Sequence, residues 1–231
     1  MAAYTLFYWP IPFRGQFVRA VLAHVHASWE ERTYDDVLAL GRTEPANQPV
    51  PLMGTPMLID HATALSISQM PAILTYLGRT HGLLPEDARG EALTAKVVAD
   101  ANDVLYEMTR YNGAQQWTTA SWKEFRPRLV RWLEIFEETG RRHGLTADTG
   151  TMLATAQPGL ADLATYVLWH TMTTKLPALR PLLDSTAPAI AGLADRLADL
   201  PEQASLRRSS DEAYGNAWCG GQIEASLRAV L

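Results

Sequence analysis

The feature that most constrains the fold is a change in hydrophobic pattern near residue 84. Before this point, short β-prone runs alternate with apolar residues at helical spacing, whereas after it every apolar stripe follows the helical period. Strands first and helices after are typical of two packed units. We therefore predict an α+β chain with two domains, a small α/β domain at residues 1–82 and an all-helical domain at residues 92–231. The polar, Pro- and Gly-containing stretch at 84–90 is the expected linker.

The first domain is predicted to follow the order β-α-β, a loop, and then β-β-α. Strands are expected at residues 4–8, 29–34, 57–60 and 64–67. One helix is expected after Gly15 and another at Pro71, which suits a first helical turn because its missing N–H would be unpaired there. The stretch at 41–54 is rich in proline and is expected to be loop. In the second domain, helical stripes are expected at residues 93–108, 125–136, 158–168 and 190–197.

Composition argues against several classes of function. The 231 residues carry a net charge of −5, so nucleic acid is not expected as the main partner, because neutralising phosphates needs a basic face. No window is apolar enough to span a membrane and the first residues do not read as a signal peptide, so we expect a soluble protein. The single cysteine, Cys219, cannot form an internal disulfide, which fits a reducing, cytoplasmic setting. The six histidines are scattered, and no metal site is expected.

Four blocks of the sequence resemble the tyrosine-type cytosolic glutathione transferases, most closely those of the pi class. They are Tyr-Thr-Leu-Phe-Tyr-Trp-Pro at 4–10 with Arg14-Gly15 after it, Thr-Pro-Met-Leu-Ile-Asp at 55–60, the run at 69–80, and Pro-Gly-Leu-Ala-Asp at 158–162. The block with Pro56 is similar to the family's loop that carries a cis-proline. The resemblance implies a thioredoxin-like first domain that binds glutathione as co-substrate, a helical domain that builds the second-substrate pocket, and a homodimer.

Conjugation of glutathione requires its thiolate, because the thiolate is the nucleophile. Lowering a thiol pKa by about 2 units takes about 2.7 kcal/mol of preferential stabilisation of the anion. One hydrogen bond to a charged group contributes about 1.5–3 kcal/mol, so a single tyrosine hydroxyl has the right strength. The resemblance implies that Tyr8, at the end of the first strand, is this catalytic residue; the alternative role for Tyr8 is a packed strand aromatic. If Tyr8 does not activate the thiol, the candidates are Ser28 and a residue of the inserted loop that follows Tyr8.

The resemblance also implies which residues contact glutathione. The set is Arg14, Gln16, Arg42, Thr55, Pro56, Gln69 and Met70. Backbone groups of Thr55, next to a cis bond before Pro56, can pair with the tripeptide as an added strand. Gln69 and the N–H of Met70 lie at a helix start, where carboxylates bind well.

Four departures from the family pattern affect this site. About two extra residues, within 11–13, separate the first strand from Arg14. Met70 stands where the family usually has a serine, and Gln16 stands where the pi class has an arginine. The loop at 41–54 shows no match to the family's tryptophan and lysine contacts, which leaves Arg42 as the substitute.

The second-substrate pocket is expected to contain Phe13, Tyr106, Arg110 and Tyr111. Tyr106 and Arg110 are four positions apart and so share one face of a helix. An apolar, aromatic pocket suits a hydrophobic electrophile. We therefore predict a glutathione transferase with a role in detoxification; cleavage of an ether or carbon–halogen bond and isomerisation of a double bond are variants. The alternative is a non-catalytic binding or scaffold protein that has kept the fold.

Overall fold

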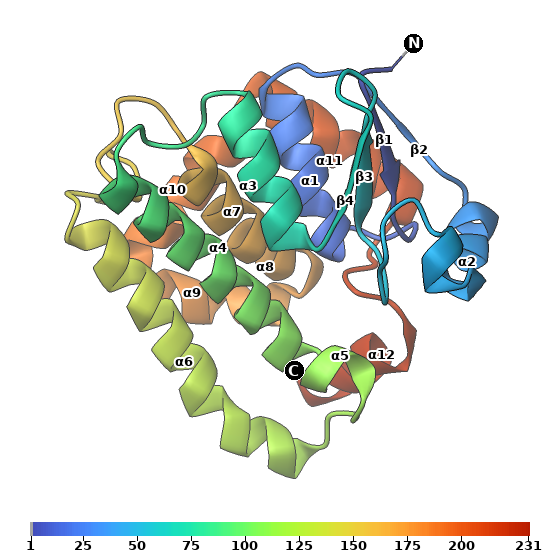
Figure 1. The fold of residues 1–231 in the computed structure, drawn as a ribbon. Coiled ribbons are helices and arrows are strands. Elements are labelled where there is room, and N and C mark those ends of the chain that lie inside the picture. Colours follow the sequence, from blue (N-terminus) through green and yellow to red (C-terminus); the bar gives the residue numbers. More distant parts are fainter. Residues whose placement is uncertain (1) are drawn as a thin grey trace.

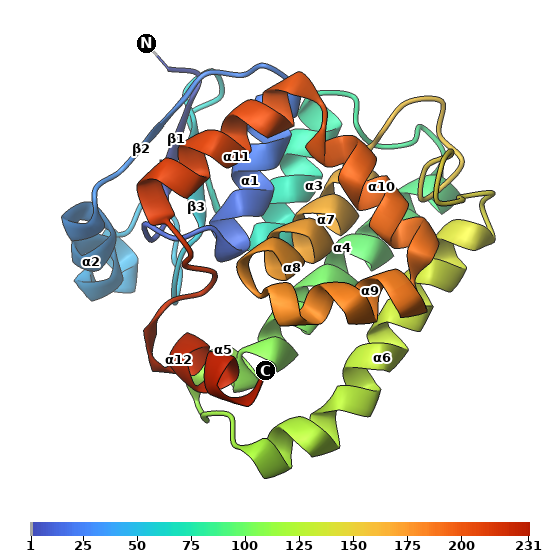
Figure 2. The ribbon, with the colours of Figure 1, turned by 180° about the vertical axis from the view of Figure 1, so that it is seen from behind.

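The computed structural model describes residues 2–231 and contains two units that pack side by side (Figure 1). The first unit carries a small sheet with helices, and the second is built of helices alone, which confirms the predicted α+β fold class. The view from behind in Figure 2 shows helix α11 (Pro201–Tyr214) of the second unit lying across helix α1 (Phe13–His24) of the first.

The sheet has four short strands in the spatial order β2-β1-β3-β4. The strands are β1 (Tyr4–Phe7), β2 (Trp29–Glu31), β3 (Met57–Asp60) and β4 (Leu65–Ser68). β1 runs parallel to β2 and antiparallel to β3, so that Tyr4 lies opposite both Trp29 and Asp60. Helices α1 and α3 (Met70–Thr80) lie between the sheet and the helical unit, and α2 (Tyr34–Arg42) lies beyond the far side of the sheet (Figure 1).

Helix α2 was not predicted, because we expected the second strand to continue to Tyr34. The strand ends at Glu31 and a helix begins after Thr33. The Thr33 hydroxyl accepts from the Asp36 N–H at 3.2 Å, and the Asp36 carboxylate accepts from the Thr33 N–H at 3.1 Å. This reciprocal capping box satisfies two N–H groups that would otherwise lack partners, and it explains why the helix begins at this point.

The second unit is a helical array in which α4 and α7 pack together. Its elements are α4 (Ala88–Met108), the turn α5 (Arg110–Gly113), α6 (Thr119–Arg141), α7 (Leu160–Tyr166), a π-helical turn (Val167–Thr171), α8 (Met172–Lys175), α9 (Arg180–Thr186), α10 (Pro188–Ala198), α11 and α12 (Gly221–Val230). The four predicted stripes correspond to α4, α6, α7 and α10. None of the helices in residues 2–231 is both long enough and apolar enough to cross a lipid bilayer.

The two units share one packed boundary. Helix α1 packs against α7 and α11, and α3 packs against α4. A fully buried amide, Gln203 on α11, donates from Nε2 to the carbonyl oxygen of Ala20 on α1 at 2.9 Å. His24 and Glu202 meet at 2.9 Å near the end of the same pair of helices. The position of each unit relative to the other is therefore defined by buried apolar and polar contacts.

Candidate active site

A cleft of about 410 Å³ lies where the first unit meets α4 and the C-terminal segment. Its walls come from the end of β1 and the loop after it, the loop before β3, the start of α3, α4 with the turn that follows, and α12. The lining residues are Tyr8, Trp9, Ile11, Phe13, Arg14, Met53, Gly54, Thr55, Pro56, Gln69, Asn102, Tyr106, Thr109, Asn112, Cys219 and Ile223.

Tyr8 follows β1 directly and lies in the wall of this cleft with only 4% of its surface exposed. Its phenolic oxygen accepts a hydrogen bond from the backbone N–H of Arg14, in the first turn of α1, at 3.0 Å. The ring packs against α1 at Gly15, where an added Cβ would lie 2.2 Å from the ring atom Cδ1. The glycine therefore allows the phenol to lie against the start of α1.

Burial raises the pKa of Tyr8 to about 12, although the Arg14 guanidinium and the N–H groups of Arg14 and Gly15 act in the opposite direction. The phenol therefore keeps its proton at neutral pH. Since the oxygen already accepts from Arg14, its O–H remains for a second partner in the cleft. This geometry makes Tyr8 a hydrogen-bond donor to an anion rather than a base.

Arg14 brings a positive charge to the same cleft. Its Nε donates to the side-chain oxygen of Asn102 on α4 at 3.2 Å, and its guanidinium carbon lies 4.8 Å from the centre of the Phe13 ring. Burial lowers the pKa of Arg14, but a guanidinium remains cationic at neutral pH. The charge beside Tyr8 therefore favours an anionic ligand.

The loop before β3 presents free backbone groups to the cleft. The Thr55–Pro56 peptide bond is cis, as predicted from the sequence. Neither the N–H nor the carbonyl of Thr55 has a hydrogen-bond partner among residues 2–231, and its buried hydroxyl lacks one as well. An extended peptide ligand has both a donor and an acceptor to pair with here.

Gln69 precedes α3 and also lines the cleft. Its backbone has a φ of 73°, a left-handed conformation that non-glycine residues rarely adopt and that is often found at functional sites. Its carbonyl oxygen accepts from Ile73 at 2.9 Å, which closes the first turn of the helix. The unpaired N–H groups of this turn favour a carboxylate at the helix start.

A family model described as the glutathione S-transferase C-terminal domain matches residues 93–230, more than half of the chain. The chain belongs to the glutathione S-transferase family. No curated protein matches it in sequence.

Solved structures agree with this family at the level of the fold. The pi-class glutathione S-transferase of Onchocerca volvulus superposes with a TM-score of 0.76 at 20% identity, over 95% of this chain and 98% of that one. The Nu-class glutathione S-transferase of Haemonchus contortus superposes with a TM-score of 0.70 at 20% identity, over 91% of this chain and 98% of that one. Prostaglandin synthase D of Nilaparvata lugens superposes with a TM-score of 0.66 at 18% identity, over 89% of this chain and 97% of that one. This similarity confirms the thioredoxin-like first domain and the helical second domain.

Among the residues predicted to contact glutathione, this member of the glutathione S-transferase family brings Arg14, Thr55, Pro56 and Gln69 to the cleft. It does not bring the other three there, namely Gln16, Arg42 and Met70. Gln16 lies two positions beyond Arg14 and so faces away from it, toward Ser210. Arg42 is exposed on α2, and Met70 is buried in the core.

Phe13 and Tyr106 line the cleft as predicted, but Arg110 and Tyr111 do not. The prediction that Arg110 shares a helix face with Tyr106 is wrong, because α4 ends at Met108. Arg110 and Tyr111 then adopt left-handed backbone angles, with φ of 47° and 65°. This bend turns both side chains toward a neighbouring hollow, where the Arg110 guanidinium lies 5.0 Å from the centre of the Trp117 ring.

Sequence reasoning did not predict the C-terminal wall of the cleft, which contains Cys219 and Ile223. The Glu224 carboxylate holds this segment by accepting from the N–H groups of Trp218 at 2.9 Å, Cys219 at 2.8 Å and Gly220 at 2.6 Å. Burial, reinforced by Glu224, raises the pKa of the Cys219 thiol to about 12. The thiol is therefore protonated and a poor nucleophile, which supports the prediction that it packs without reacting.

Asn102 is a second residue that the sequence did not indicate, since an asparagine on a polar helix face carries no signal of its own. Its role as the partner of Arg14 depends on a contact between the two units. Residues 2–231 contain no cluster of three or more His, Cys, Asp or Glu side chains able to hold a metal ion. The groups that the described residues bring to the cleft are a phenol, a guanidinium and free backbone groups.

Proposed function

We propose that this protein binds glutathione in the cleft, stabilises its thiolate with Tyr8, and directs the sulfur onto a hydrophobic electrophile. The single observation that supports this most strongly is the position of Tyr8. Its phenol is protonated, its oxygen is held by the Arg14 N–H, and its ring borders a cleft large enough for a ligand. Because the oxygen accepts from Arg14, its O–H is left to donate to a bound sulfur anion.

Glutathione is an extended, anionic tripeptide, and the cleft offers complementary groups for each of its parts. The backbone of its cysteinyl residue pairs with the free N–H and carbonyl of Thr55. The γ-glutamyl carboxylate lies at the start of α3, where Gln69 and the unpaired N–H groups of the first turn are donors. Met70 contributes only through its backbone, because its side chain is buried.

The sulfur lies within reach of the Tyr8 hydroxyl, which donates a hydrogen bond to the thiolate. A bond of this kind contributes about 1.5–3 kcal/mol, which corresponds to about 1–2 units of thiol pKa. The nearby Arg14 charge adds to this stabilisation. In the reaction, a sulfur–carbon bond forms as the leaving group departs with its electron pair, or as an activated double bond accepts the electrons. Phe13 and Tyr106 hold the apolar part of the electrophile.

The family leads us to propose further that the protein is a tyrosine-type transferase closest to the pi class. We also propose that it forms a homodimer and acts in the cytoplasm in detoxification. Conjugation is the reaction that the cleft supports most directly, since it requires only a stabilised thiolate and an apolar surface beside it.

Substitution of Tyr8→Phe tests the proposed role of the phenol. We expect glutathione affinity to be kept and the pKa of the bound thiol to rise by about 1–3 units, which is about 1.4–4 kcal/mol. The titration is followed by the ultraviolet absorbance of the thiolate, and kcat/KM for a chlorinated aromatic is expected to fall at neutral pH. Tyr4→Phe is the matched control, since the Tyr4 hydroxyl bonds His81 at 2.8 Å and Tyr4 does not line the cleft. An unchanged thiol pKa and unchanged activity in Tyr8→Phe would show that another group activates the sulfur.

A non-catalytic role is the second candidate, and one observation favours it. Gln16, Arg42 and Met70 supply no side chain to the cleft, so its glutathione contacts are fewer than the resemblance implies. Retention on immobilised glutathione, together with a lowered pKa of the bound thiol, would favour the enzyme. Failure to bind at millimolar glutathione would leave the scaffold as the function.

A further inference from the structure

A second, smaller cavity lies between α1, α8 and α11 and shares no lining residue with the cleft around Tyr8. Its volume is about 60 Å³. A single water molecule needs about 10–15 Å³ of such cavity volume. The cavity therefore has room for one small polyatomic ion but not for a tripeptide or a nucleotide. The residues that matter for its chemistry are Gln16, His170, Lys175, Arg207, Ser210 and Asp211.

Arg207 places an uncompensated positive charge at this cavity. Its Nε is buried and has no hydrogen-bond partner among residues 2–231. Within that part of the chain, no carboxylate lies within ion-pair distance of its guanidinium. A buried donor without a partner costs about 1–3 kcal/mol, and in native proteins such a group calls for an explanation.

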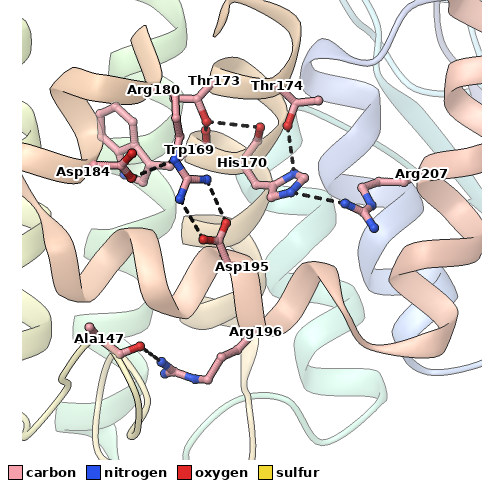
Figure 3. Close-up of polar contacts among 10 residues, drawn as sticks. All are labelled: Ala147, Trp169, His170, Thr173, Thr174, Arg180, Asp184, Asp195, Arg196 and Arg207. Atoms are coloured by element: carbon pink, nitrogen blue, oxygen red, sulfur yellow. Dashed lines mark hydrogen bonds and ion pairs between the residues drawn. The ribbon is translucent and has the colours of Figure 1, made fainter.

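The only side chain hydrogen-bonded to the Arg207 guanidinium, among those described, is His170 in the π-helical turn (Figure 3). Nη1 of Arg207 lies 3.4 Å from Nε2 of His170, and an arginine can only donate, so Nε2 accepts. The proton of the neutral ring is then on Nδ1, which lies 3.4 Å from the Thr174 hydroxyl. Burial, followed by the Arg207 charge, lowers the pKa of His170 to about 4. His170 is therefore neutral, so the ring accepts from Arg207 and adds no second positive charge beside it.

The other polar groups around the cavity are mainly donors. The Lys175 ammonium donates to Asp211 at 2.6 Å and to the Gly215 carbonyl, which leaves one N–H. The Ser210 hydroxyl donates to the Gln16 side-chain oxygen at 3.2 Å, which leaves the Gln16 amide nitrogen without a partner in residues 2–231. Gln16, Lys175 and Ser210 are all buried.

The charges on the wall give a net excess of one positive charge. Arg207 and Lys175 each contribute +1, and Asp211 contributes −1 through its pair with Lys175. We propose that this cavity is a binding site for a small oxyanion of the phosphate or sulfate type, held by the Arg207 guanidinium, the Gln16 amide and Lys175. An oxyanion supplies several acceptor atoms and the negative charge that would balance the excess positive charge of the wall.

Titration with inorganic phosphate tests the site on the intact protein. Isothermal calorimetry is expected to show saturable binding of phosphate, and of sulfate, to the unmodified chain. Arg207→Met is expected to weaken phosphate binding by at least about tenfold, because it removes both the charge and the forked donor. Arg208→Met is the matched control: Arg208 is the next residue on α11, is exposed and does not line the cavity, so binding should be unchanged.

A second measurement is independent of whether Arg207→Met folds. In nuclear magnetic resonance spectra of the unmodified protein, the ring signals of His170, identified by their loss in His170→Gln, are expected to shift saturably with phosphate and not with chloride at equal ionic strength. The proposal is overturned if phosphate at tens of millimolar leaves these signals where chloride leaves them, since the cavity then holds water only. It is equally overturned if Arg207→Met and Arg208→Met bind phosphate alike.

Discussion

Single residues in this protein acquire their chemistry from where the backbone places them. Burial raises the pKa of Tyr8 and lowers the pKa of His170, and both side chains are neutral at pH 7. The neutral Tyr8 keeps a hydrogen-bond donor in the cleft. The neutral His170 accepts a hydrogen bond from Arg207.

Acid should destabilise the protein through His170. In the unfolded chain this ring takes up a proton near pH 6.5, whereas in the folded protein it does so only near pH 4. Between these values the unfolded state binds more protons, so the free energy of unfolding falls as the pH is lowered. The full contribution is about 3 kcal/mol, present above pH 6.5 and lost by pH 4. Urea unfolding of wild type and His170→Gln at several pH values should show a weaker pH dependence in the variant.

His26→Asn is the control for this measurement. His26 is exposed and has a left-handed backbone, which asparagine tolerates. Its pH profile is expected to match that of wild type. A profile of His170→Gln that is indistinguishable from wild type would mean that His170 titrates in the folded protein much as it does in the unfolded chain.

At the scale of elements, the long amphipathic helices were predictable because their apolar periods are long enough to read. The short strands were predictable from their β-prone residues and the turn residues around them. Helix α2 was missed because its nine residues are too few for a clear period, although Thr33 and Asp36 carried a capping signal. Helix α11 was missed because its sequence is mostly polar. We expected α4 to extend to Arg110, because no glycine or proline occurs between Met108 and Asn112 to indicate the left-handed turn.

The same reasoning explains which parts of the candidate site were foreseen. Tyr8, Arg14, Thr55 and Gln69 lie in the first unit, where local motifs indicate turns and helix starts. Asn102 and Ile223 reach the cleft only through contacts between segments that are far apart in sequence. A single sequence carries no signal for such contacts.

The buried ion pair that links α1 to β2 is expected to contribute strongly to the stability of the folded protein. Arg19 on α1 is 1% exposed and binds both carboxylate oxygens of Glu31 at 2.7 Å, and it donates to the Ile11 carbonyl at 2.9 Å. Arg19→Met leaves these acceptors without a partner, and we expect a loss of about 3 kcal/mol. Urea denaturation measures this loss as a lower midpoint.

Arg131→Met is the control for Arg19→Met. Arg131 pairs with Glu134 on the surface of α6, with 73% and 49% of the two side chains exposed. Exposed pairs of this kind contribute little, so we expect a change of no more than about 0.5 kcal/mol. Equal losses in the two variants would contradict a special role for the buried pair.

At the scale of the whole molecule, the two units are parts of one packed body. Their buried side chains form one continuous apolar cluster, and Gln203 links α11 to α1 by a buried hydrogen bond. Separating the units would expose the faces of α1 and α3 that pack against α7, α11 and α4.

We therefore expect a single cooperative unfolding transition. Far-ultraviolet circular dichroism, which follows the helices, and tryptophan fluorescence should give coincident urea curves. Gln203→Ala is expected to lower the midpoint while keeping one transition, because it removes the buried hydrogen bond from Gln203 to the Ala20 carbonyl. Two separated transitions in wild type would show that the units unfold independently.

The cleft has one wall at Tyr8 and another at Ile223, almost the whole chain apart. Because the ribosome synthesises the chain from its N-terminus, Tyr8 emerges early and Ile223 emerges much later. No partly translated chain can therefore hold the finished pocket, and the residues proposed to bind glutathione emerge long before the wall that encloses them.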